Sequence, residues 1–155
     1  MCPDHRKTRE SKRGSIERSG EEKMNQNLMQ IRTAHAFEEA AQHANDEKFL
    51  ALAQELPMMF QMNGFLATWA FLLAKKKEEH QKTLAALLRH FQEPRLNLLL
   101  PHNHNEPHAL FLRWIGEREG VEPLSTVELQ RLTEEAIEFA GWLKRAAKTY
   151  GGGDD

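Results

Sequence analysis

One short segment gathers three histidines, His102, His104 and His108. Imidazole is the commonest metal ligand in proteins, so this segment is the first candidate for a metal-dependent hydrolase. On a helix His104 and His108 would share one face, but Pro107 puts that spacing at or before a helix start. A zinc site needs three or four ligands, and Glu106 is the only obvious addition. We therefore expect a solvated loop without a bound metal, and keep the hydrolase as an alternative.

Other residue types that could do catalysis form no constellation. Cys2 lies in a charged N-terminal segment without a scaffold to activate a thiol. The carboxylates of Glu78–Glu79 and Glu134–Glu135 are chain neighbours, and helical neighbours diverge by about 100°, so we expect them to face solvent. No glycine-rich phosphate loop follows a strand, and no serine stands in a nucleophile elbow. The sequence therefore predicts a protein that is not an enzyme and needs no cofactor.

A cluster of cations stands near the end of the chain, where Lys144, Arg145 and Lys148 fall within one helical turn and opposite the apolar face. Gly141 shares that outer face, and Trp142 lies at its edge. Cations near a helix C-terminus compensate the helix dipole, and they can also face the phosphates of a nucleic acid. The two roles are compatible, so this cluster is a candidate nucleic-acid surface.

A second basic cluster, Lys75, Lys76, Lys77 and Lys82, stands between two predicted helices. A run of like charges is usually a solvated surface. The formal net charge of the chain is −2, so any nucleic-acid binding must come from local patches such as these rather than from an overall field.

The first 23 residues carry seven Lys/Arg and five Asp/Glu with few large apolar side chains. Such a segment cannot bury enough apolar surface to fold, so residues 1–23 are expected to form a disordered charged tail. The remainder holds 14 basic and 18 acidic residues, a net charge of −4. A length of 155 residues fits one domain, placed at residues 24–150 and followed by a disordered tail at 151–155.

The rest of the chain has the three- and four-residue periodicity of amphipathic helices and no alternation typical of strands. A first helix runs from Asn25, and a second follows a cap at Asn45. A third run ends before Pro94, and another helix starts near Asn105–Pro107 and ends at Gly120. We expect an all-α fold, a single compact bundle of five or six helices.

The last helix has the most regular pattern. Its apolar residues alternate steps of three and four: Leu129, Leu132, Ala136, Phe139, Leu143, Ala146 and Tyr150. Ser125 and Glu128 predict a capping box at its start, and Gly151 predicts its end.

The stretch 56–74, LPMMFQMNGFLATWAFLLA, holds no charged residue over 19 positions. A membrane span needs an apolar run of roughly this length. Hydrocarbon would leave Gln61 and Asn63 unpaired, and Pro57 and Gly64 interrupt the run. We therefore expect a buried core segment of two short helical pieces hinged at Asn63–Gly64, with Pro57 in a first turn or at a kink.

The N-terminal residues bear on the cellular location. Cys2 is the single cysteine, which excludes an internal disulfide and suits a reducing compartment. The N-terminal segment also lacks the apolar core of a signal peptide. We therefore expect a cytoplasmic protein that is not inserted in a membrane.

Two stretches together resemble one known family. The letters LPMMFQMNGFLATWAFL match its Leu-Pro, Asn-Gly and Phe-Leu signature. The run from Thr133–Glu134 to Phe139, with Trp142-Leu143-Lys144-Arg145 and Ala147, resembles its C-terminal helix. That family is the small (fifth) subunit of the type III-B CRISPR Cmr effector complex, and the resemblance covers most of residues 24–150.

The resemblance implies a non-catalytic helical subunit in antiviral defence. Copies would stack along the effector filament with the other Cmr subunits, and would touch guide and target RNA phosphates through the assembly. Lys144 and Arg145 would face RNA. Structural roles are implied for six residues of the matching stretches: Leu56, Pro57, Asn63, Gly64, Phe71 and Trp142. The alternative is a helical protein–protein adaptor that never touches nucleic acid.

Overall fold

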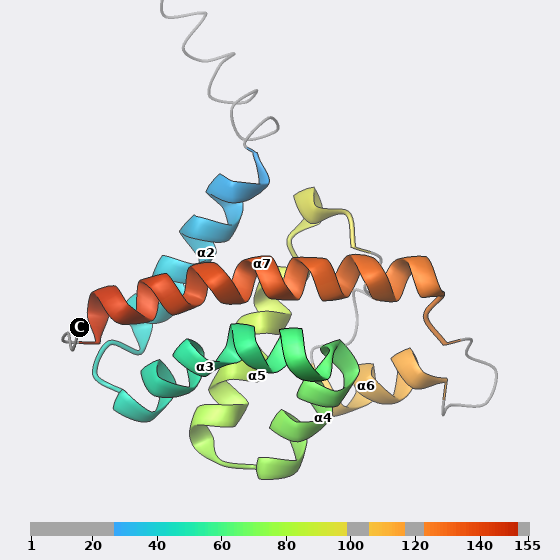
Figure 1. The fold of residues 1–155 in the computed structure, drawn as a ribbon, viewed down its shortest axis with the longest axis horizontal. Coiled ribbons are helices and arrows are strands. Elements are labelled where there is room, and N and C mark those ends of the chain that lie inside the picture. Colours follow the sequence, from blue (N-terminus) through green and yellow to red (C-terminus); the bar gives the residue numbers. More distant parts are fainter. Residues whose placement is uncertain (1–26, 99–105, 117–122, 152–155) are drawn as a thin grey trace, which may run out of the picture. The chain divides into compact units, whose positions relative to one another are not determined.

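The computed structural model describes residues 27–98, 106–116 and 123–151, and within these ranges it contains six α-helices, one 3₁₀ turn and no strand (Figure 1). The predicted all-α fold is confirmed. Residues 1–23 and 152–155, predicted as tails, lie outside the described residues. Backbone contacts divide the chain into two units, residues 1–31 and 32–155.

The described part of the first unit is the start of helix α2 (Leu28–Gln42). Asn27 Oδ1 accepts a hydrogen bond from the amide of Gln30 at 2.9 Å, and Gln30 Oε1 accepts one from the amide of Asn27 at 3.1 Å. This reciprocal pairing satisfies two amides that the first turn of a helix leaves without partners.

Helices α3 (Glu47–Asn63) and α7 (Thr126–Tyr150) pack against each other at the centre of the second unit (Figure 1). The apolar seam predicted for α7 is buried from Leu132 to Ala146, whereas Tyr150 at its end is exposed. The facing side of α3 buries Phe49, Leu52, Ala53, Leu56 and Phe60. Apolar burial on this scale is the main source of the fold's stability.

Capping residues set the helix boundaries, in part as predicted. The capping box is confirmed: Ser125 Oγ accepts from the amide of Glu128 at 3.1 Å, and Glu128 Oε1 accepts from that of Ser125 at 3.2 Å. The prediction of Asn45 as a cap is wrong, because Asp46 takes that position and its Oδ1 accepts from the amide of Phe49 at 3.1 Å. Asn and Asp side chains are equally long and cap equally well, so the difference is one of position: Asp46 directly precedes the first helical residue, Glu47.

Helix α6 (Pro107–Ile115) is shorter than predicted. Its start at Pro107 is as predicted, and the cap is Glu106, whose carboxylate oxygens accept from the amides of His108 and Ala109. It ends at Gly116, not Gly120, because Gly116 adopts a left-handed conformation (φ 78°) that glycine tolerates.

The stretch 56–74 breaks at Gly64, as predicted: α3 ends at Asn63, and α4 (Phe65–Lys75) begins after Gly64. The second predicted piece is confirmed as the 11-residue α4. The first is not a separate short helix, because Pro57 lies inside the 17-residue α3 and neither begins nor ends a helix. Pro57 has no amide hydrogen and so removes one hydrogen bond from the helix. The burial of the neighbouring Leu56 and Phe60 side chains offsets this loss. None of the described helices is both long and apolar enough to cross a membrane.

An aromatic cluster joins α4 to α6 and to α5 (Glu78–Phe91), which ends before the 3₁₀ turn Pro94–Leu96. Trp69 lies 5.0 Å from Trp114 and 5.5 Å from Phe65 between ring centres. Trp69 Nε1 also donates a hydrogen bond to the carbonyl of Pro107 at 3.1 Å, which ties α4 to the first residue of α6. This cluster fixes the three shorter helices against one another.

Candidate nucleic-acid interface

The cluster on α7 lies on its outer side, where Arg145 and Lys148 are exposed and Lys144 is half-buried. The guanidinium carbon of Arg145 lies 4.6 Å from the centre of the Trp142 ring. Gly141 has no side chain, and Arg145 Nη1 lies 3.7 Å from where a Cβ would stand. Trp142 is itself packed against the core, so the exposed Arg145 has a fixed aromatic surface that favours one direction of its side chain along the helix.

These cations have no acidic partner in the part of the chain that the structure describes: no carboxylate lies within ion-pair distance of Lys144, Arg145 or Lys148. The three residues lie on the outer side of α7, as their spacing predicted. That spacing did not predict the contact between Arg145 and Trp142, because side-chain direction on a helix depends on rotamers as well as spacing.

The second cluster is less uniform than its sequence suggests. Lys75 Nζ lies 5.2 Å from the centre of the Phe71 ring. Lys76 follows the last residue of α4 and has a left-handed backbone conformation. Lys77 precedes the first residue of α5. Lys82 differs, because its ammonium bonds Asp46 at 2.6 Å and Glu78 at 3.1 Å. A phosphate would have to compete with both carboxylates for Lys82.

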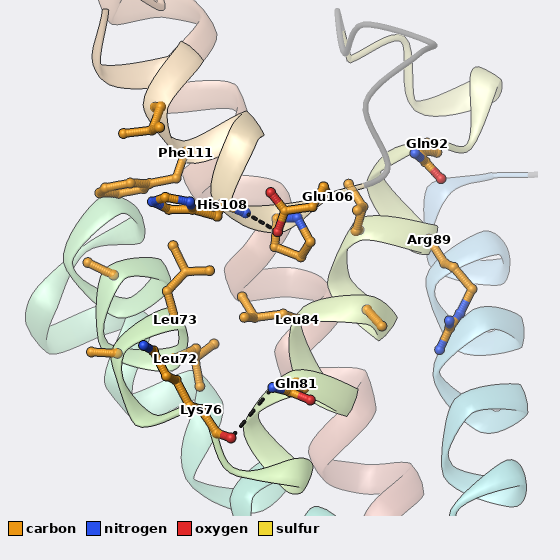
Figure 2. A pocket seen from close by; sticks show the side chains of 16 residues that line it. Leu72, Leu73, Lys76, Gln81, Leu84, Arg89, Gln92, Glu106, His108 and Phe111 are labelled. Atoms are coloured by element: carbon orange, nitrogen blue, oxygen red, sulfur yellow. Dashed lines mark hydrogen bonds between the residues drawn. The ribbon is translucent and has the colours of Figure 1, made fainter. Parts of the chain in front are cut away.

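A groove of about 990 Å³ opens between α4, α5 and the start of α6 (Figure 2). Leu73, Leu84 and Phe111 are among its apolar lining residues, and Figure 2 shows their side chains converging from the three helices. The volume falls in the range of small-molecule and peptide sites.

Two charged groups at the rim of this groove, Glu106 and Arg89, already serve the fold. Glu106 caps α6, and Arg89 donates two hydrogen bonds to Glu39, at 2.6 and 2.7 Å. Gln81 Nε2 donates to the carbonyl of Lys76 at 3.5 Å. The groove therefore offers apolar contact rather than a set of catalytic groups.

A buried polar network joins α7 to α5 and to Arg32 of α2. Arg32 donates to both carboxylate oxygens of Glu135, at 2.7 and 2.8 Å, and His90 Nε2 lies 2.8 Å from Glu135 Oε2. The prediction that Glu135 faces solvent is wrong, whereas Glu134 is exposed as predicted. Helical periodicity could have predicted the burial of Glu135, because it lies three residues after Leu132 and therefore on the apolar seam.

The network continues through a second histidine. His35 Nδ1 lies 2.8 Å from His90 Nδ1, and His35 Nε2 lies 3.4 Å from Glu93 Oε1. Burial lowers the pKa of His90, and Glu135 only partly opposes this. Burial by itself would raise the pKa of Glu135, but the hydrogen bonds from Arg32 and His90 hold it below its usual value. Because His90 is fully buried, the network is part of the fold and not a site that a substrate reaches.

The histidine segment falls largely outside the described residues, which include His108 but not His102 or His104. His108 is exposed in the first turn of α6. Within residues 27–98, 106–116 and 123–151, no three His, Cys, Asp or Glu side chains are grouped as metal ligands.

A comparison with protein families agrees with the resemblance seen in the sequence. The family model described as CRISPR-associated protein (Cas_Cmr5) matches residues 28–150. This range includes the stretch 56–74 and the whole of α7, the two elements that carry the signature. The chain therefore belongs to the Cas_Cmr5 family of CRISPR-associated proteins, the small subunits of the type III-B Cmr complex.

Proposed function

We propose that this chain is a non-catalytic small subunit of the Cmr effector complex, which stacks with other subunits and with copies of itself and contacts guide and target RNA phosphates. Membership of the Cas_Cmr5 family supports its place in the complex. The observation that carries the RNA contact is the α7 surface, where Arg145 is held on Trp142 beside Lys144 and Lys148.

The chemistry of this surface suits phosphate. A guanidinium that is already ordered can bond a phosphate through two parallel donors, and the flanking ammonium groups add charge without a required geometry. The body of the chain has a net charge of −4 outside residues 1–23. A single copy is therefore expected to bind RNA weakly, and useful affinity arises when several such patches align in one assembly.

The test is charge reversal in the assembled complex with Lys144→Glu, Arg145→Glu and Lys148→Glu together. Target-RNA affinity should fall, and the slope of log affinity against log salt should become shallower by up to about 2, since each single-strand phosphate contact contributes about 0.7. The matched control, Lys144→Arg with Arg145→Lys and Lys148→Arg, keeps the charge and should keep the slope. An unchanged affinity and slope, with all subunits still co-purifying, would contradict the phosphate contact.

A helical protein–protein adaptor is the second candidate, and the groove of Figure 2 favours it. Its apolar walls offer contact to another protein without any charged recognition group free at the rim except Lys76 and His108, among the described residues. Ultraviolet crosslinking of the purified complex separates the two functions. An adaptor yields no adduct between this chain and guide or target RNA, whereas the proposed subunit yields adducts on α7 peptides.

A further inference from the structure

Phe71 is not placed as a core residue would be. The resemblance implies a structural role for it, yet its side chain is 41% exposed, whereas Trp69 and Leu72 on the same helix are fully buried. An aromatic ring left half in water forgoes much of the free energy that its burial would provide. The exposed part of the ring is therefore available for a contact outside this chain.

The ring borders a hollow of about 520 Å³ between α3, α4 and α5. Leu52, Met59 and Ala67 contribute apolar surface to the hollow, and His80 lines it beside Phe71. The His80 ring meets the Phe71 ring edge-on, with centres 5.8 Å apart. A flat aromatic ligand has room here, because small-molecule pockets start at about 300 Å³.

The charges around the hollow are arranged in two zones. The hollow itself is lined by Glu55, Glu79 and the Asn63 amide, with one cation, Lys48. Carboxylates accept hydrogen bonds from the amino groups of bases. Outside, Lys75 extends over the Phe71 ring, and Lys76 and Lys77 follow it. In the described residues no carboxylate pairs with these three lysines.

We propose that this hollow receives a nucleobase of a single-stranded RNA segment, stacked on Phe71, while Lys75 and Lys77 meet the adjoining phosphates. Every base has an aromatic face, so stacking needs no particular sequence. The two carboxylates outnumber Lys48 in the lining, so the hollow favours a neutral base over a phosphate. A protein partner fits less well, because Lys and Glu are depleted at the centre of protein interfaces.

This inference rests on the proposed function, since it requires RNA at the subunit surface. It adds a second kind of contact, which differs from the α7 surface in its physics. Loss of a stacking ring weakens binding equally at every salt concentration, whereas loss of a cation changes the salt dependence.

The test compares Phe71→Leu with Phe71→Trp in the assembled effector complex, with a single-stranded target RNA that carries 2-aminopurine at successive positions. Phe71→Leu should weaken RNA binding roughly 5- to 150-fold with an unchanged salt slope. It should also remove quenching at one 2-aminopurine position, while Phe71→Trp keeps both. Met62→Leu is the matched control, because Met62 is 75% exposed and does not line the hollow.

The outcomes separate the two proposals. If Phe71→Leu binds RNA as tightly as the parent while the α7 charge reversal weakens binding, the base site is refuted and the proposed function stands. If neither variant changes RNA binding, both are refuted. Loss of partner subunits on Phe71→Leu would overturn the base site in favour of a protein contact. If nucleoside 5′-monophosphates bind the hollow as tightly as the RNA does, the proposal that the hollow binds an RNA strand is refuted.

Discussion

Charged side chains in this protein divide by what they meet. Arg32, Lys82 and Arg89 each bond a carboxylate that lies far away in the chain, so they hold helices together. Arg145 lies on an aromatic ring instead, and so does Lys75. Substitution in the first group removes a partner from a part-buried carboxylate and lowers stability. Substitution in the second group should leave the fold largely unchanged, since exposed positions usually change stability by less than about 0.5 kcal/mol.

The paired histidines at the centre of the network predict a pH dependence. Because the Nδ1 atoms of His35 and His90 lie 2.8 Å apart, only one of them can carry the proton between them, and two imidazolium rings cannot coexist there. Burial lowers the pKa of His90, and it also lowers that of His43 and His80. The unfolded chain therefore takes up these protons at a higher pH than the folded chain does.

The free energy of unfolding should accordingly fall as the pH drops below about 6.5, the ordinary histidine pKa. Urea unfolding at pH 7.5 and pH 5.5 measures the difference. His108→Asn is the control, since this exposed ring lies outside the network, and the variant should show the same loss on acidification. A free energy of unfolding that stays constant or rises from pH 7.5 to pH 5.5 would contradict the lowered pKa values of the buried histidines.

At the scale of elements, the turn between α3 and α4 depends on one residue. Gly64 has φ 82° and ψ 175°, a region that only glycine populates readily, and its amide donates to the carbonyl of Phe60 at 2.9 Å. The turn lets α3 stop and α4 start without an intervening loop, so Phe60 and Phe65 stack with ring centres 6.0 Å apart.

Gly64→Ala should lower the free energy of unfolding by about 1–3 kcal/mol. The cost is backbone strain rather than a clash, because no atom lies within 4 Å of the added Cβ. Gly141→Ala is the matched control with the opposite sign. It lies within α7, where alanine is preferred to glycine by about 0.5–1 kcal/mol, and its added Cβ meets Arg145 only at 3.7 Å. Equal stability of both variants in urea would contradict this account.

On the scale of the whole molecule, one apolar core runs through α3, α4, α5, α6 and α7. A shared core couples the helices, so this part of the chain should unfold in one transition. It also gives the α7 cations and Phe71 a rigid support. The proposed RNA contacts need such support, because flexible contacts lose more entropy on binding.

Leu132→Ala tests the coupling. Leu132 is buried near the start of α7, and its truncation should lower stability by about 2–5 kcal/mol. In a Trp142→Phe background, which removes the tryptophan of α7 itself, far-ultraviolet circular dichroism reports all helices and fluorescence reports Trp69 and Trp114 on α4 and α6. Both midpoints should shift together, while Val127→Ala, at a position 66% exposed, should move neither. A fluorescence midpoint that stays in place would show that α7 unfolds separately.

The sequence by itself determined the helical class, most helix positions and the family. Helical periodicity predicts which face of each element is apolar, and local capping signals such as Ser125–Glu128 act within one turn. The break at Gly64 was predictable for the same reason, since it depends on the conformational freedom of one residue. The signature in 56–74 and α7 identified the family because it consists of particular residue types in a particular order along the chain.

Only the tertiary structure decided which charged residues pair within the fold and which form no ion pair among the described residues. Arg32 meets Glu135 from 103 positions away, and Lys82 meets Asp46 from 36. No local pattern fixes such distances, because they follow from how the helices pack. The same packing leaves Phe71 half-exposed between α3 and α5, although its helix is otherwise apolar. Periodicity locates a side chain on a face of its own helix, and the neighbouring helices decide whether that face is covered.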